Sequence, residues 1–347
     1  MPLVIPVFIP HQGCPHCCVF CNQYRISGFT GEKYVSAREV GNIIQNWLKR
    51  SSVDGREVQV AFYGGSFTGM DLSRQEELLD AVAPYVAEGL VNSVRLSTRP
   101  DYVDQKTVSF LRRKNVGIVE LGVQSLDDNV LEACQRGHSA EQSVAAVKLL
   151  QESGFMVGVQ LMLGLPLQTT RSLIQTVKKV AALNPDFVRI YPVLVLQGSI
   201  LANLYEKGRY KPLSLGAAVA QAARMKKHLD EYGIRIVRIG LQSGPELEKT
   251  LLAGPYHPAF GEMVSSRLML KKTRKILKDV KSGEQVTLTI NERDQSMFRG
   301  MKSVNMKRLM ELNLVDRFIL RTDASLPRLS VRVTSHSLSL NAVTLTR

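Results

Sequence analysis

Residues 104–122 read DQKTVSFLRRKNVGIVELG, and this stretch predicts one complete helix–strand unit. Its first twelve residues are amphipathic, as expected of a helix that covers one face of a sheet. The short run at 116–122 is apolar and β-branched, which is typical of a strand. A helix that leads directly into such a strand forms part of a βαβ unit, so the stretch predicts a parallel sheet.

The same alternation continues over the first two thirds of the 347-residue chain. The strand-like runs are 3–9, 58–64, 91–97, 116–122, 155–163, 186–193 and 234–240. The amphipathic stretches between them are 36–50, 73–89, 104–115, 139–154, 169–183 and 214–233. This many βαβ units favour an α/β fold with a full or partial parallel (β/α) barrel over an open doubly wound sheet, although periodicity alone leaves the choice open.

Local signals mark where several of these helices begin and end. Ser73, Ser139 and Ser214 stand where N-cap residues are expected, since a serine side chain can accept a hydrogen bond from the first helical turn. Glycines follow three of the helical stretches, at residues 89, 154 and 233. Glycine tolerates the left-handed conformation that commonly ends a helix, so these positions predict helix ends.

The pattern changes after about Gly240, where Gly/Pro-rich and then basic segments replace the regular alternation. We therefore expect a barrel core at 1–240 and a small basic α+β extension at 241–347. From residue 265 onward, seventeen Lys and Arg stand against seven Asp and Glu, which places +10 of the net charge of +14 there. Such a basic region fits a polyanion such as RNA, and it equally fits a role in solubility alone.

Cysteine usage and hydropathy point to the cytoplasm. The chain holds five cysteines, too few for a disulfide scaffold at this length, and four of them lie within eight positions. The apolar N-terminus lacks a basic segment and a small-residue cleavage site, so it predicts a buried strand and not a signal peptide. No apolar run approaches the roughly 18 residues that a membrane span requires.

The cysteine cluster lies in the segment GCPHCCVFCNQ, residues 13–23, directly after the first predicted strand. Cys14, Cys18 and Cys21 have the spacing CxxxCxxC, and three thiolates can hold three irons of a 4Fe–4S cluster. The fourth iron then has no protein ligand and can bind a small molecule. The competing hypothesis is a zinc site that begins at Cys14 and Cys17. Cys18 and Cys21 could supply its second ligand pair, but four ligands within eight residues leave little chain to wrap a tetrahedron, and no separate CxxC or HxxxH pair exists elsewhere in the sequence.

Polar or glycine-rich motifs follow four consecutive predicted strands. They are YGGSF at 63–67, STRPD at 97–101, ELGVQS at 120–125 with RGH at 136–138, and GLP at 164–166. Because the chemistry of parallel barrels lies at the carboxyl ends of the strands, we expect these motifs to form one site with the cysteines.

In this order the motifs resemble the radical S-adenosylmethionine (SAM) superfamily. The likeness covers roughly residues 5–240. It is greatest to the radical core of the Elongator catalytic subunit, which modifies the wobble uridine of tRNA, and more distant to oxygen-independent coproporphyrinogen III oxidases. Residues 241–347 carry no acetyl-coenzyme A motif, so the resemblance does not extend to the acetyltransferase domain of the Elongator enzyme.

The resemblance implies a 4Fe–4S cluster bound by Cys14, Cys18 and Cys21, with SAM on the open iron and Cys17 without a role. It also implies a set of SAM-contacting residues, in which Thr98 and Gln160 stand where some relatives have carboxylates: Phe20, Gly64, Gly65, Ser66, Thr98, Gln124, Arg136 and Gln160. The cofactors would generate a 5′-deoxyadenosyl radical, and the protein would orient the reactants and exclude water.

The implied partners are RNA, with tRNA the favoured class, through the basic C-terminal region, and a reducing electron donor such as flavodoxin or ferredoxin. Alternatives are the same radical chemistry on a small molecule such as a porphyrin, and a zinc-stabilised RNA-binding protein without catalysis. The residues do not identify the substrate, the hydrogen that is abstracted or the oligomeric state.

Overall fold

The computed structural model describes residues 2–14, 18–22, 34–51, 55–281 and 283–335. Its main feature is a seven-stranded, entirely parallel sheet in the order β1-β2-β3-β4-β5-β6-β8. The strands are β1 Leu3–Phe8, β2 Val58–Tyr63, β3 Ser93–Thr98, β4 Val116–Gln124, β5 Met156–Leu163, β6 Phe187–Pro192 and β8 Arg235–Ile239. In the described part of the chain, β1 and β8 are the two edges, so the barrel is not closed. The sheet curls into a half-barrel, which confirms the partial form of the predicted full or partial barrel.

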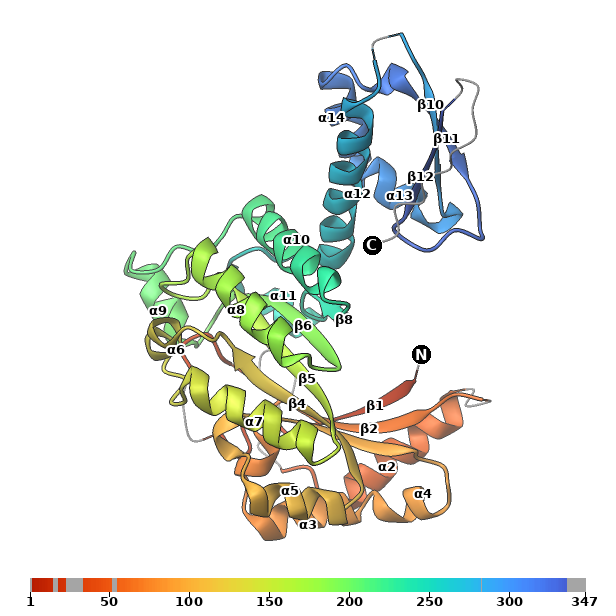
Figure 1. Cartoon of the computed structure of the whole chain (residues 1–347). Coiled ribbons are helices and arrows are strands. Elements are labelled where there is room, and N and C mark those ends of the chain that lie inside the picture. The colour runs from red at the N-terminus through yellow and green to blue at the C-terminus, as the bar shows by residue number, and fades with distance from the viewer. Residues whose placement is uncertain (1, 15–17, 23–33, 52–54, 282, 336–347) are drawn as a thin grey trace.

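Helices cover the outer face of this sheet (Figure 1). They include α2 Ala37–Arg50, α3 Leu72–Asp80, α4 Ala83–Ala87, α5 Gln105–Arg113, α7 Ala140–Glu152, α8 Thr170–Leu183 and α10 Leu215–Glu231. Alternate apolar residues of each strand, such as Val58, Val60 and Phe62 in β2, are buried with the apolar faces of these helices in one large core. The opposite set of strand residues therefore faces the concave side.

Most of the predicted helix boundaries are confirmed. Ser139 and Ser214 cap α7 and α10, and the Ser139 side chain completes a capping box with Gln142. Ser73 is not a cap, because α3 begins one residue earlier and follows Asp71, which makes no side-chain cap hydrogen bond. The three helix-ending glycines all have positive φ, between +70° and +76°.

The chain after β8 forms α11 Pro245–Thr250, the short β9 Leu251–Ala253, which pairs with β7 Val195–Leu196, and α12 Phe260–Lys278. A three-stranded sheet follows, in the order β11-β10-β12 with β10 Val286–Ile290, β11 Phe318–Thr322 and β12 Val331–Ser335. Helices α13 Gln295–Arg299 and α14 Val304–Glu311 pack beside it. This confirms an α+β extension.

Helix α12 belongs to both parts of the molecule. Its first turns place Phe260 and Val264 in the large core, whereas Met269 and Leu277 lie in a second, smaller core beneath the three-stranded sheet. A continuous helix therefore connects the half-barrel to the extension, and the division of the chain at residue 240 remains a proposal. No helix in the described ranges is long and apolar enough to cross a membrane.

Candidate active site

The first loop of the half-barrel lies directly against the loop that follows β2. The amide of Ser66 donates to the Gln12 carbonyl over 2.9 Å, and the amide of His11 donates to the Gly64 carbonyl over 3.3 Å. Gly13 and Gly65 make this approach possible. A Cβ at Gly13 would lie 2.1 Å from the Ser66 backbone oxygen, and one at Gly65 would lie 2.4 Å from the Gln12 backbone oxygen. The GGSFTG segment thus positions the start of the cysteine loop.

Cys18 lies in a cationic environment at the carboxyl ends of the strands. Its sulfur accepts a hydrogen bond from Nη1 of Arg136 at 3.0 Å, and Nη1 of Arg99 lies 3.8 Å away. Cys14 is close enough to interact electrostatically with the same groups. Burial first, and then the neighbouring Cys18, raise the pKa of the Cys14 thiol, while Arg99 and Arg136 oppose the rise. Guanidinium groups beside thiols favour thiolates, which are the form that binds metals.

Both arginines are themselves held in place. The Arg136 side chain donates to the Gly122 carbonyl at 2.5 Å. The backbone carbonyl of Arg136 accepts a hydrogen bond from the Arg99 side chain. Arg99 also forms a two-point contact with Asp101 at 2.8 and 3.0 Å. The STRPD and RGH motifs are therefore linked physically, and together they fix the cations that face Cys18.

The other cysteines have different surroundings. Cys21 follows Cys18 in a turn, and its amide donates to the Cys18 carbonyl at 2.9 Å. Cys134 is fully buried, and burial raises the pKa of its thiol to about 12, as expected of a packing residue. Cys17 lies outside the described residues. The four described cysteines are not joined in disulfides, and no three His, Cys, Asp or Glu side chains within the described ranges form a preassembled metal-binding group.

Hydroxyl groups at the ends of β2 and β3 separate into two kinds. The Thr98 hydroxyl is 2.6 Å from the Thr68 hydroxyl and 3.0 Å from the Ser66 hydroxyl, so Ser66 and Thr98 bond each other and are buried. Ser97 lies on the opposite side of β3, and its buried hydroxyl has no hydrogen-bond partner among the described residues. Ser97, which the motif analysis did not select, is thus the hydroxyl left available for a ligand.

Gln124 also offers an unused polar atom at this edge. It ends β4 with a positive φ of +65°, an uncommon conformation for a non-glycine residue, and its side chain is buried. Its Oε1 atom has no partner in the described part of the structure, while its Nε2 atom lies beside Gly122. A buried amide oxygen without a partner is costly, so it indicates a missing ligand.

Phe20 and Gln160 are in different surroundings. Phe20 packs in a small apolar cluster that joins Cys18 and Val19 of the cysteine loop to Leu201. Gln160 faces the concave side from the middle of β5, where its Nε2 atom lies 3.4 Å from Oε2 of Glu120. Whether either residue contacts SAM stays a prediction.

A buried charged group centred on Glu120, which belongs to the ELGVQS motif but was not among the expected SAM contacts, occupies the concave face. Glu120 has no exposed surface, and its carboxylate is 2.7 Å from Nη2 of Arg95 and 2.6 Å from Nε of Arg189. The Tyr63 hydroxyl donates to Glu120 over 3.0 Å, and burial followed by the Glu120 charge raises the Tyr63 pKa. The signal in the sequence was an ionisable residue inside several apolar strand runs, a pattern that implies a polar inner face.

Comparison with known proteins decides the family. The sequence profile of the radical SAM superfamily matches residues 8–180, and a profile described as a Radical_SAM C-terminal domain matches residues 185–269. The chain belongs to the radical SAM superfamily. This assignment confirms the resemblance inferred from the motifs, and it covers the half-barrel and the first part of α12.

Among its relatives, this radical SAM protein is 28% identical to a tRNA uridine(34) acetyltransferase of Methanocaldococcus jannaschii over 273 residues, covering 68% of this chain and 50% of the relative. It is 27% identical over 261 residues to Elongator complex protein 3 of Saccharomyces cerevisiae, covering 62% of this chain and 46% of the relative. The chain therefore spans about half the length of these curated relatives.

Two further comparisons concern the length and the fold. An uncharacterized protein of M. jannaschii is 28% identical over 255 residues, covering 70% of this chain and 76% of that protein. The solved structure of archaeal Methanocaldococcus infernus Elp3 with an N-terminal deletion superimposes with a TM-score of 0.61 at 23% identity. It covers 78% of this chain and 63% of that structure, which supports the shared fold.

Proposed function

We propose that this radical SAM protein binds a 4Fe–4S cluster through Cys14, Cys18 and Cys21, binds SAM beside it and modifies RNA, with tRNA as the substrate class. The observation that carries the proposal is a set of buried polar groups without partners in the motifs that follow β3 and β4, one of which, Arg136, also contacts the Cys18 sulfur. The Gln124 oxygen, the Ser97 hydroxyl and Nε of Arg136 are buried without partners in the described structure.

These residues fit the cofactors by their chemistry. Three reduced thiols suit an iron–sulfur cluster, and two fixed guanidinium groups compensate the negative charge that three thiolates bring. The unpaired hydroxyl and amide groups can bind the polar amino-acid and ribose groups of SAM. When bound, the cofactors would supply one-electron cleavage of SAM and a 5′-deoxyadenosyl radical that removes a hydrogen atom from substrate.

The structure sharpens the proposed roles of individual residues. Gly65 and Ser66 contribute mainly by holding the loop that carries Cys14, since the Gly65 backbone lies against residues 9–12 and the Ser66 hydroxyl bonds Thr98. Ser97 is a better candidate than Thr98 for a SAM contact, because its hydroxyl is free for one. Gln124 and Arg136 keep the ligand-facing roles that the motifs implied.

Support for RNA as substrate comes from two sources. The relatives include proteins described as tRNA uridine(34) acetyltransferases, and the similarity to the M. jannaschii protein covers 68% of this chain. The chain also has a net charge of +14, concentrated toward its C-terminus. We do not extend the proposal to acetyl transfer. Electrons for SAM cleavage would come from a donor such as flavodoxin or ferredoxin.

Anaerobic reconstitution tests the cofactor part. The wild-type protein should bind about four irons with sulfide and convert SAM into 5′-deoxyadenosine when reduced. Cys18→Ser should lose iron and activity, whereas Cys17→Ser and Cys134→Ser should retain both. Retention of iron by Cys18→Ser together with loss in Cys17→Ser would show that the ligand register is wrong, and a single zinc with no iron would support the non-catalytic alternative.

A second experiment tests the SAM contacts in the reconstituted enzyme. Ser97→Ala and Gln124→Ala should each weaken SAM binding, measured by calorimetry, because each removes a polar partner from a buried site. Thr107→Ala is a matched control, because Thr107 lies on α5, outside the motifs that form the site. Unchanged SAM affinity in both test variants would contradict the proposed site.

A further inference from the structure

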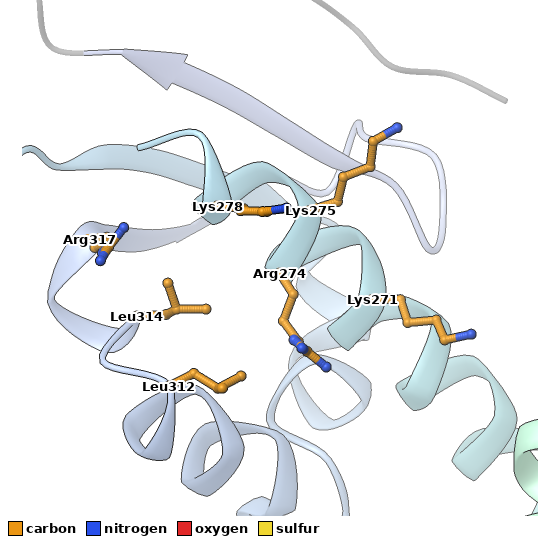
Figure 2. Close-up of a pocket in the computed structure, with 7 residues that line it drawn as sticks. All are labelled: Lys271, Arg274, Lys275, Lys278, Leu312, Leu314 and Arg317. Carbon is orange, nitrogen blue, oxygen red and sulfur yellow. The ribbon is translucent and has the colours of Figure 1, made fainter. Parts of the chain in front are cut away.

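The C-terminal extension contains a basic cavity of about 610 Å³ that is separate from the cysteine site. Figure 2 shows that α12 supplies four of its cations and that the segment after α14 supplies the facing side, with the fifth cation, Arg317. Its lining residues are Lys271, Arg274, Lys275, Lys278, Leu312, Leu314 and Arg317. Five of the seven lining residues are cationic and none is acidic, so the cavity selects for anions.

The cations on α12 lack carboxylate partners. Within the described residues, Lys271, Arg274, Lys275 and Lys278 form no ion pair, although Lys226 and Arg308 on neighbouring helices do. Mutual repulsion makes such a cluster unfavourable without an anion, because like charges on adjacent helical turns destabilise a helix. The lack of ion pairs to these four side chains in the described part of the chain therefore separates this cluster from an ordinary solvated helix face.

The cations form a continuous stripe along one side of α12. Arg267, Lys271, Arg274 or Lys275, and Lys278 recur every three or four residues, while Met269, Thr273 and Leu277 on the opposite side are buried. From Arg267 to Lys278 the stripe is about 16 Å long, at about 1.5 Å per helical residue. This length suits several consecutive phosphates better than a single phosphate ion.

The stripe continues toward the half-barrel. Burial, and then the positive charges of Arg267, Arg224 and Lys227, lower the pKa of Lys271, so cations of α10 and α12 share one field. Lys227 is paired with Glu231 at 3.4 Å, which leaves Arg224 as the α10 cation that adds to the stripe. Figure 1 shows α10 beside α12 at the β8 end of the sheet, between the half-barrel and the extension.

The cavity also has a rigid apolar side. Leu314 is buried, and Nη1 of Arg317 donates to the Val280 carbonyl at 2.7 Å, which fixes the far wall relative to the end of α12. Leucine side chains between cations provide an apolar surface for a ribose or base while the cations hold phosphate. Because α12 is packed into both cores, the site has a fixed position relative to the half-barrel.

We propose that this cavity and the stripe on α12 together bind the sugar–phosphate backbone of the substrate RNA. The site consists of the stripe residues Arg267, Lys271, Arg274, Lys275 and Lys278, with Arg317 on the facing side. The inference rests on the RNA part of the proposed function and adds a docking site that is distinct from the cysteine loop. The elongated, unpaired positive charge favours a polyanion over a small ligand, and the apolar wall favours a nucleic acid over a membrane surface.

Binding of a labelled tRNA transcript to the full-length protein tests this site. Fluorescence anisotropy across a salt series gives the dissociation constant and its dependence on salt. In the triple variant Arg274→Gln, Lys275→Gln, Lys278→Gln, the slope of log affinity against log salt should fall by about 2 to 3, because each lost phosphate contact removes about 0.7 to 0.9. Affinity should fall roughly tenfold or more.

A charge-matched variant controls for the change in net charge. Lys49→Gln, Lys148→Gln, Lys178→Gln removes three exposed cations from α2, α7 and α8, and it should keep the wild-type slope. Circular dichroism melting of all three proteins checks that the triple variant is folded. Equal losses in both variants would show non-specific attraction and overturn the site.

The outcomes separate the two proposals. If wild-type protein binds tRNA and the cavity variant binds it equally well, the docking site is wrong but RNA remains the substrate class. If wild-type protein cleaves SAM but binds no tRNA at low salt, the RNA part of the proposed function fails and the docking inference fails with it. Binding to phosphatidylserine vesicles without binding to tRNA would also overturn the inference, in favour of a membrane surface.

Discussion

Replacing Gly65 by alanine should damage the cysteine loop without touching a cysteine. The new methyl group would lie 2.4 Å from the Gln12 oxygen and 2.5 Å from the Ile9 oxygen, whereas ordinary contact begins at 3.4 Å. Since both neighbours are backbone atoms, the segment 9–12 must move by about 1 Å to make room. The cysteine loop begins directly after this segment, so its start must move as well.

The cost follows from the contacts that are lost. Overpacking of a close-packed region costs about 1 to 3 kcal/mol. Displacement of Gln12 also breaks its 2.9 Å hydrogen bond from the Ser66 amide, which contributes about 0.5 to 1.5 kcal/mol. We therefore expect the free energy of unfolding to fall by about 2 to 4 kcal/mol.

Two measurements check this prediction. Urea unfolding of the apo-protein gives the free energy, and iron analysis after anaerobic reconstitution shows whether the loop still binds a cluster. Gly216→Ala is the matched control, because no atom lies within 4 Å of a Cβ at this position in α10. It should be neutral or stabilise the protein by up to about 1 kcal/mol. If Gly65→Ala unfolds like wild type and binds full iron, the contact between the two loops does not position the cysteines.

Three other perturbations probe the charged groups. Glu120→Gln should lower the free energy of unfolding by about 3 to 5 kcal/mol, measured in urea, because it leaves the buried Arg95 and the partly buried Arg189 without a counter-charge. A loss below about 1 kcal/mol would contradict this role. Arg136→Gln should lower the reduction potential of the reconstituted cluster, because it removes a cation 3.0 Å from the Cys18 sulfur. The potential is measured by electron paramagnetic resonance. An unchanged potential would show that this cation does not tune the cluster. Burial, and then Arg136, lower the pKa of His138 from 6.5 to about 4. Neutral His138 should therefore favour folding fully above pH 6.5 and lose this contribution as the pH falls toward 4, and His138→Gln should weaken that part of the acid sensitivity in denaturation curves.

The fold class followed from local signals. Each strand run is buried on its outer face and each amphipathic helix covers it, so periodicity alone indicated βαβ units and a parallel sheet. The same logic placed the polar motifs together, since carboxyl ends of parallel strands share one edge. The cap at Ser73 failed because α3 begins at Leu72, two residues before the start that this cap implies, a normal uncertainty of helix ends.

The identity of the chemistry was likewise present in the sequence. The cysteine spacing and the order of the strand-end motifs carried the resemblance to radical SAM enzymes, and comparison with known proteins confirmed that family. The sequence alone did not determine the individual SAM contacts as well, because adjacent residues of a strand face opposite sides of the sheet. Thr98 and Ser97 differ by one position, yet one hydroxyl is bonded within the protein and the other is left without a partner.

What the sequence by itself determined is the sheet, its covering helices, the family and the cluster of thiols, because those depend on patterns within short segments. Tertiary structure alone decided the contacts between distant segments. It placed Glu120 between Arg95 and Arg189, laid Gly65 against the backbone of residues 9–12, and formed an open pocket between α12 and residues 312–317. Such contacts depend on curvature, register and side-chain direction across strands, which no single segment encodes.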